Sequence, residues 1–193
     1  MSELVLGLRN LRRDYMWTNI RAIVLRDHED IVLPGTTIQL RRGTEIVAPR
    51  WLVRMLSEQK ILEPREEPMK INELGRYSFL ETRSRQQSAL LQKLPTDFYQ
   101  KLRDYLETIR RKLSESPSPE IIDEYRRARS YTYDILRVRL QRILSLVQAG
   151  EESSEIRGQL ARLTPEELIL YKTIRRLIED WQKEVTGLEE VLI

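Results

Sequence analysis

The sequence predicts an α+β protein: a small N-terminal antiparallel β-domain with a covering helix, followed by a larger all-α helical bundle domain. Three observations support this. Short β-type runs separated by turn residues occupy the first third of the 193-residue chain. The segment EPREEPM at 63–69 carries two prolines and four charges, which is typical of a linker. Beyond it, apolar residues recur at helical spacing. We therefore expect a β-rich domain at 1–64, a linker at 65–70 and an α-helical domain at 71–193.

The first domain is predicted to begin with a helix at residues 2–15, capped by Ser2. The runs NIRAIVL, DIVLP, TTIQL and TEIVAP follow, separated by turn residues, and we expect them to form one small antiparallel sheet. Pro49 ends the last run and favours a helix at 50–59, after which KILEP returns as an edge strand. The helical side chains predicted to cover the sheet are Trp51, Leu52, Met55 and Leu56.

The second domain is predicted to open with a helix at 71–94 whose polar centre is exposed. Thr96 is expected to cap the next helix. Ser118 and Pro119 are expected to start a long helix at 120–148, which Gly150 ends. The inward stripe of the first of these helices is predicted at Phe98, Leu102, Tyr105, Ile109 and Leu113. The long helix carries one apolar stripe, part of which we expect to pack on other helices of this chain or on another chain: Ile121, Tyr125, Ala128, Thr132, Leu136, Leu140, Ile143 and Val147.

A short helix, IRGQLARL, precedes the final one, which Thr164, Pro165 and Glu167 start with a capping box. The final helix carries an apolar stripe in steps of three and four residues, close to the period of a supercoiled seam. This stripe is longer than one short neighbouring helix can cover. We therefore expect part of it to pack against another subunit, with Trp181 as anchor, although burial within the chain's own bundle is the alternative. The predicted interface residues are Tyr171, Ile174, Ile178, Trp181, Val185 and Leu188.

Composition narrows the functional classes. No apolar run reaches the roughly 18 residues of a membrane span, and the N-terminal charges are unlike a signal peptide, so we expect a cytoplasmic protein. The absence of cysteine excludes disulfides and thiolate metal sites. Arginine provides 26 of the 33 basic residues, a bias that suits pairing with carboxylates at interfaces as well as with phosphates.

No catalytic, cofactor-binding or metal site is predicted. The single histidine, His28, lies in a polar turn, and the sequence has no phosphate-cradling glycine loop and no nucleophile motif. Carboxylate pairs occur at 66–67, 151–152 and 189–190, in a linker, a loop and a chain end, where solubility explains them better than Mg²⁺ binding. We expect the protein not to be an enzyme.

One group of arginines on the long helix is a candidate for DNA contact. Two of its members follow an aspartate at spacings that form ion pairs within a helix, which favours a solvated face instead. The candidate residues are Arg126, Arg127, Arg129, Arg137, Arg139 and Arg142.

The order of these segments resembles the GINS replication-complex family, in the archaeal pattern and in the subunit type whose small domain comes first. The segment IVAPRWLVRMLSEQKILEP is similar to the family's strand, proline, tryptophan helix and return strand. LPTDFYQKLRDYL, EYRRARSYTYDILRVRLQRIL and LTPEELILYKTI resemble segments of its helical domain, although the last also resembles the subunit type whose small domain comes last. The residues that carry the family-like motif are Pro49, Trp51, Leu52, Leu94, Pro95, Asp97, Phe98 and Tyr99.

The resemblance implies a non-catalytic scaffold without cofactors. It implies assembly with a paralogous GINS subunit, two copies of each forming a tetramer. It further implies association with the MCM helicase and a RecJ-like or Cdc45-like protein at nucleoid-associated replication forks, with weak or indirect DNA contact and no membrane.

Two other classes remain open from the residues alone. A DNA-binding transcription or chromatin factor would combine a winged small domain with a helical dimerisation part, and it would show sequence preference as well as salt-dependent binding. A Mg²⁺ enzyme would depend on the carboxylate pairs, and their substitution would abolish its activity.

Overall fold

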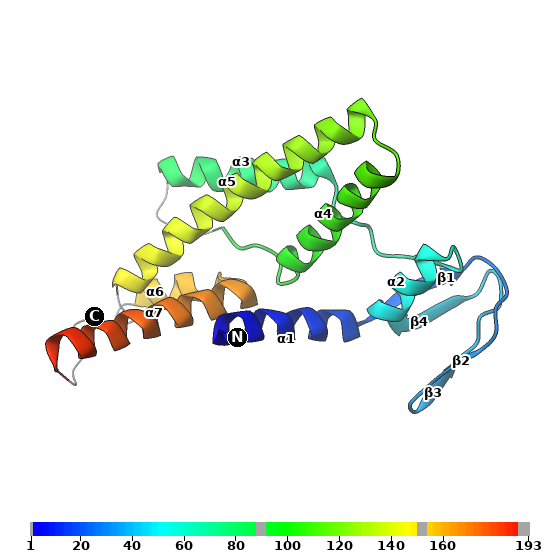
Figure 1. The fold of residues 1–193 in the computed structure, drawn as a ribbon, viewed down its shortest axis with the longest axis horizontal. Helices are drawn as coiled ribbons and strands as arrows, with labels where there is room; N and C mark the ends of the chain where they lie inside the picture. Colours follow the sequence, from blue (N-terminus) through cyan, green and yellow to red (C-terminus); the bar gives the residue numbers. More distant parts are fainter. Residues whose placement is uncertain (1, 88–91, 150–153, 189–193) are drawn as a thin grey trace. The chain divides into compact units, whose positions relative to one another are not determined.

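The computed structural model describes residues 2–87, 92–149 and 154–188. Its chain forms two compact units, Arg9–Pro68 and the combination of Met1–Leu8 with Met69–Ile193. We call the first the β-unit and the second the helical unit. Helix α1 (Glu3–Trp17) contributes its first residues to the helical unit and the remainder to the β-unit. The structure confirms the predicted fold class of a small antiparallel sheet region followed by a larger helical part (Figure 1).

The β-unit is built on a three-stranded antiparallel sheet in the order β4-β1-β5. Its strands are β1 (Asn19–Val24), β4 (Glu45–Pro49) and β5 (Leu62–Pro64), so KILEP returns as an edge strand as predicted. Alternate β1 residues are buried, which is the pattern of a sheet with one covered face. The buried residues of this core are Ile20, Ala22, Val24, Ile38, Leu40, Ala48, Leu52, Val53, Leu56, Ile61 and Leu62.

The other two strands, β2 (Ile31–Leu33) and β3 (Thr36–Ile38), form a separate two-stranded hairpin. The expectation of one continuous sheet was therefore wrong. Pro34 and Gly35, the latter at φ +85°, make a tight turn that pairs β2 with β3 locally. Both edges of β1 are already occupied by β4 and β5, so the hairpin joins the β-unit through buried side chains such as Ile38.

Helix α2 (Arg50–Glu58) follows Pro49 directly and covers the sheet. Leu52 and Leu56 are buried and Trp51 is partly buried, as predicted, but Met55 is 44% exposed. Val53 is buried in its place. The buried arc of the helix is therefore rotated toward Val53, which leaves Met55 on the solvent side.

The helical unit contains α3 (Ile71–Gln87), α4 (Phe98–Glu115), α5 (Pro119–Ala149), α6 (Ser154–Leu160) and α7 (Pro165–Thr186). Helix α3 lies alongside α5, which also packs against α4, and the last part of α5 packs against α6 and α7 (Figure 1). Two buried clusters result. One contains Met69, Leu74, Leu94, Phe98, Leu102, Tyr105, Ile109, Ala128 and Ile135, and the other Ile143, Leu146, Val147 and Tyr171.

The long helix α5 begins as predicted, because the Ile121 amide donates to Ser118 Oγ at 3.3 Å. Its buried stripe differs in the middle: Leu136 and Leu140 are exposed, whereas Ile135 and Val138 are buried. The helix supplies Ala128 and Ile135 to one cluster and Ile143, Leu146 and Val147 to the other, so a single straight stripe does not describe its buried face. Gly150, the expected end signal, lies outside the described residues.

The starts of α4 and α7 differ in how well they were predicted. The N-cap of α4 is Asp97 rather than Thr96, and it makes no side-chain cap bond; its carboxylate instead pairs with Lys101 at 2.8 Å. The N-cap of α7 is Thr164, and the capping box with Glu167 is complete. Among the helices of the described residues, none is long and apolar enough to span a membrane.

The segment predicted as a linker is held at both ends. The Arg65 amide donates to the Arg21 carbonyl at 2.9 Å, and Glu66 pairs with Arg50 at 2.6 Å, both within the β-unit. Met69 is 5% exposed and belongs to the first cluster of the helical unit. The division into separable modules at 65–70 stays a prediction. Only the residues between Glu66 and Met69 separate the contacts made to the β-unit from those made to the helical unit.

Candidate functional site: an assembly interface and a buried charge cluster

The most buried polar feature of the helical unit is an ion cluster around Arg139 of α5, whose side chain is 1% exposed. Its Nε and Nη2 donate to the two carboxylate oxygens of Glu167 at 2.7 and 2.5 Å. Its Nη1 donates to Glu81 Oε1 at 3.2 Å and to the Gln92 carbonyl at 2.7 Å. One guanidinium thereby connects α3, the segment before α4, α5 and α7.

Glu167 is the acceptor centre of this cluster. Besides Arg139, its carboxylate accepts from the Tyr99 hydroxyl of α4 at 2.7 Å and from the Thr164 amide at 2.9 Å. The residue that completes the α7 capping box therefore also binds two other helices. A buried carboxylate with this many donors is hydrogen-bonded throughout, which is the condition under which burial of a charge is tolerated.

Burial and neighbouring charges shift the pKa values of three groups in the cluster. Burial raises the pKa of the Glu81 carboxyl, and the charge and hydrogen bond of Arg139 offset this only in part. Burial also acts to lower the pKa of Arg139, but the hydrogen bond and charge of Glu167 outweigh it, so that pKa is raised. Burial and the neighbouring Glu167 raise the pKa of the Tyr99 hydroxyl well above its usual range. Arg139 stays charged and Tyr99 stays a donor, so both keep their hydrogen bonds to Glu167 and cross-link α4, α5 and α7.

The raised pKa of Glu81 predicts a pH-dependent difference between the protein and Glu81→Gln. A carboxyl whose folded pKa is raised contributes stability below its unfolded pKa of about 4.5, and this contribution is lost as the pH rises through the folded pKa. Relative to Glu81→Gln, the unmodified protein should therefore lose stability as the pH rises above about 4.5. Urea denaturation of both proteins across this range measures the difference.

At neutral pH Glu81→Gln should change the free energy of unfolding by no more than about 1 kcal/mol, because an amide oxygen can still accept from Arg139. Glu115→Gln, at an exposed position on α4, controls for the loss of one charge. A constant difference between the protein and Glu81→Gln at every pH would contradict the prediction.

The structure divides the arginines proposed for DNA contact. Arg139 is buried and ion-paired, so its inclusion in that group was wrong. Arg127 pairs with Asp123 at 3.0 Å, as the spacing indicated, and Arg129 lies over the Tyr125 ring at 5.8 Å. Arg126 and Arg137 are exposed, and Arg142 is half-buried. DNA contact by the remaining five stays a prediction.

The predicted interface residues on α7 fall into two sets. Tyr171 is 1% exposed and lies in the second cluster of this chain's own core, and Ile174 and Ile178 pack against that cluster. They are therefore largely occupied within the chain. Trp181, Val185 and Leu188 are 62%, 64% and 54% exposed, and Leu177 joins them at 63%. These four exposed side chains, Leu177, Trp181, Val185 and Leu188, are called the α7 stripe below.

A second exposed stripe runs along α5. Tyr133, Leu136, Leu140 and Leu144 are each at least 40% exposed and are spaced by three and four residues, so they share one side of the helix. Its signal was present, since α5 carries more apolar positions than a single inward stripe needs. Leu136 and Leu140 belong to the predicted apolar stripe of the long helix, whereas the buried residues of this stretch are their neighbours Ile135 and Val138. We call these four residues the α5 stripe.

The remaining polar residues singled out in the sequence are His28 and the acidic pairs. In the part of the chain that the structure describes, no group of three or more acidic or histidine side chains could hold a metal ion. His28 is exposed, and its Nδ1 lies 3.1 Å from the Glu29 carbonyl. The acidic pairs at 151–152 and 189–190 lie outside the described residues, and Glu66 of the first pair is bound to Arg50.

A helical bundle with two exposed apolar stripes and a buried ion cluster that joins its helices has the character of an assembly module. The comparison with protein families agrees: residues 57–186 match the model described as the GINS complex protein helical bundle domain, Sld5. The match covers β5 and all of α3 to α7, including the motif residues Leu94, Pro95, Asp97, Phe98 and Tyr99. The chain belongs to the GINS family and is a subunit of the GINS complex of DNA replication. A search among curated proteins finds no match.

Proposed function

We propose that this chain is a non-catalytic GINS subunit that assembles with a paralogous subunit, two copies of each forming a tetramer. The assembled complex supports the MCM replicative helicase together with a RecJ-like or Cdc45-like protein at the nucleoid-associated fork, in the cytoplasm. The observation that carries the proposal is the pair of exposed stripes on α5 and α7.

Energetics favours a partner on these stripes. The α5 stripe contains four large apolar side chains in helical register, and the α7 stripe contains three, followed by Leu188 just beyond the C-cap Gly187. Exposed apolar surface of this kind marks an interaction site. Each Å² of apolar surface that a partner removes from water favours the free energy of association by roughly 25 cal/mol. The entropic and desolvation costs of association reduce this gain. Both stripes lie on long helices, which suits packing against the helices of a subunit with the same bundle.

The charge of the chain is consistent with a scaffold role. Of the five remaining candidate arginines, Arg127 is paired within its own helix and Arg129 stacks on a tyrosine, so any DNA contact would be weak or indirect. The family is a structural component of the replication complex, and we propose that this subunit likewise acts by binding, without turnover of its own.

Co-expression with a paralogous GINS subunit tests the assembly. We expect one tagged subunit to retain the other through high-salt purification, and native mass spectrometry to give a mass of two plus two chains. The purified complex, added to MCM, should increase the rate of duplex unwinding, whereas this chain alone should not. A stable monomer in the presence of the paralogue would contradict the proposal. Salt-dependent duplex binding with sequence preference would favour a DNA-binding factor instead.

A further inference from the structure

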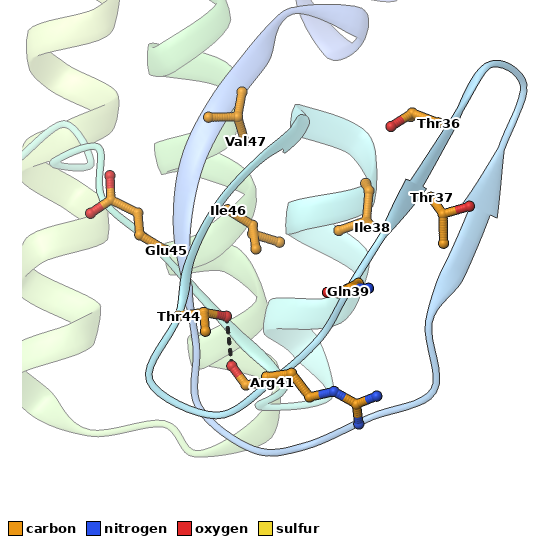
Figure 2. Close-up of a pocket in the computed structure, with 9 residues that line it drawn as sticks. All are labelled: Thr36, Thr37, Ile38, Gln39, Arg41, Thr44, Glu45, Ile46 and Val47. Atoms are coloured by element: carbon orange, nitrogen blue, oxygen red, sulfur yellow. Dashed lines mark hydrogen bonds between the residues drawn. The ribbon is translucent and has the colours of Figure 1, made fainter.

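The β-unit contains an open groove between β3 and β4, with a volume of about 420 Å³ (Figure 2). In the turn that joins the two strands, Thr44 Oγ1 donates to the Arg41 carbonyl at 2.6 Å. The charged side chains that line the groove, Arg41 and Glu45, are paired with Asp30 and Arg21. This lining does not identify a ligand. The charges beside the α5 and α7 stripes of the helical unit are more informative.

Helices α5 and α7 run in the same direction where they meet (Figure 1). Arg139 of α5 bonds to Glu167 of α7, and one turn further along both helices Ile143 and Tyr171 share a buried cluster. Because a helix turns by about 100° per residue, these contacts fix the side of the helix pair on which each exposed stripe lies.

Both stripes lie on the same side of this helix pair. Viewed from the N-terminus, the centre of the α5 stripe is about 85° clockwise from the side of α5 that contacts α7. The helical residues of the α7 stripe are centred about 60° anticlockwise from the side of α7 that contacts α5. Opposite rotations on two parallel neighbours bring both stripes to one face, which we call the α5–α7 face.

The two stripes occupy diagonal corners of the α5–α7 face. Counted along both helices from the contact of Arg139 with Glu167, Leu177 lies level with Ala149, where α5 ends. The α7 stripe therefore starts where α5 stops, whereas the α5 stripe lies earlier along the pair, on the other helix. A half turn about an axis perpendicular to the face exchanges these two corners, which is the symmetry of a two-fold dimer.

Exposed charges of opposite sign border the two stripes. Arg126 and Arg137 border the α5 stripe on the side away from α7. Asp180 and Glu184 border the α7 stripe on the side away from α5. All four side chains are exposed, and none makes an ion pair with another residue that the structure describes. The α5–α7 face is therefore basic along one outer border and acidic along the other.

This arrangement identifies a second copy of the chain as the occupant. A half turn places the α5 stripe of each copy over the α7 stripe of the other. It also places the basic border of each copy against the acidic border of the other, so that Arg137 lies near Glu184 of the second copy. A partner that offered apolar surface alone would cover the stripes but leave these four charges without counter-charges.

We propose that this chain, when its paralogue is absent, pairs with a second copy through the α5–α7 face by two-fold rotation. In this pair α5 of each copy lies antiparallel to α7 of the other, and the apolar stripes are covered between borders of opposite charge. The inference rests on the proposed function, because it assigns a second partner to the stripes that the paralogue covers in the complex. It describes the subunit before assembly.

Charge reversal tests the pairing, because each border can be inverted separately. Arg126→Glu/Arg137→Glu makes both borders acidic, and Asp180→Arg/Glu184→Arg makes both basic. Either variant alone should self-associate with a Kd at least about tenfold above that of the unmodified protein, because like charges then face each other. Mixed in equal amounts, the two variants should form a heterodimer with a Kd within about threefold of that of the unmodified homodimer. Sedimentation of the full-length chains over a concentration series measures these constants, and native mass spectrometry identifies the heterodimer.

Lys172→Glu/Lys183→Glu is the matched control. It changes the net charge by the same amount as Arg126→Glu/Arg137→Glu, but both lysines are exposed on the side of α7 opposite the α7 stripe. Its homodimer should have a Kd within about twofold of that of the unmodified protein, because salt screens charges that lie away from the contact. Circular dichroism of all three variants should show unchanged helical content, since every substituted side chain is exposed.

Three results would overturn the proposal. The first is an unmodified chain that stays monomeric up to its solubility limit. The second is a homodimer that neither charge reversal weakens, and the third is a mixture of the two reversed variants that does not pair. A chain that self-pairs as expected but does not bind the paralogue would contradict the proposed function and support this inference.

Discussion

Arg139→Met should destabilise the helical unit by about 3–5 kcal/mol, which is the cost of breaking a buried ion pair by removing one partner. The substitution leaves Glu167 and Glu81 buried without their shared cation, and the Gln92 carbonyl loses a donor. Methionine fills part of the space but supplies no donor. The protein should unfold at a markedly lower urea concentration, with loss of helical circular dichroism.

Arg137→Met is the matched control, because it makes the same substitution two residues away on the same helix at an exposed position. It should change stability by less than about 0.5 kcal/mol. Arg139→Lys should be intermediate, since one ammonium keeps the charge but cannot reproduce the two-pronged contact with Glu167. Equal stability of Arg139→Met and Arg137→Met would show that the cluster does not stabilise the fold.

The second large effect is expected on assembly. Trp181→Glu should weaken association with the paralogous subunit by about 2 kcal/mol or more, roughly 30-fold, because it places a charge at the centre of the α7 stripe. Trp181 is 62% exposed in this chain, so the isolated subunit should retain its helical content and its unfolding midpoint. Sedimentation of equimolar mixtures measures the association.

Lys172→Glu is the control for this variant. It lies nine residues earlier on α7, on the opposite side of the helix, and it is exposed. It should assemble normally. Unfolding of the isolated Trp181→Glu subunit would assign Trp181 to the internal core, and normal assembly of that variant would remove the α7 stripe from the interface.

Local signals in the sequence predicted most of the elements. These signals depend on only a few neighbouring residues. The helices after Ser118 and Thr164 begin where expected, and so does the change from strand to helix at Pro49. The pairing of strands was less predictable. Whether β3 joins β4 or pairs only with β2 depends on which edges other strands occupy, and that information is distributed along the whole β-unit.

The candidate site was only partly predictable for a similar reason. Helical periodicity finds an apolar stripe, but it does not say whether the chain itself or another subunit covers it. Tyr171 and Trp181 belong to one stripe in the sequence, yet α5 and α6 cover only the first. The residues next to Arg139 in the sequence do not indicate that its side chain is buried. Its ion-pair partners, Glu81 and Glu167, are far away in the sequence.

The N-terminal residues of α1 have a consequence for the order of folding during synthesis. Glu3 pairs with Arg176 across a separation of 173 residues, and Gly7 approaches Ile169 closely enough that an added Cβ would lie 3.2 Å from it. Because α1 is synthesised before α7, these residues of α1 can reach their native contacts only after α7 has been made. Contacts between residues so far apart in the sequence slow folding. Closing the intervening loop costs conformational entropy before the contacts form and stabilise the structure. The β-unit can complete its strands once residue 68 has emerged, whereas the helical unit closes only when translation of α7 is finished.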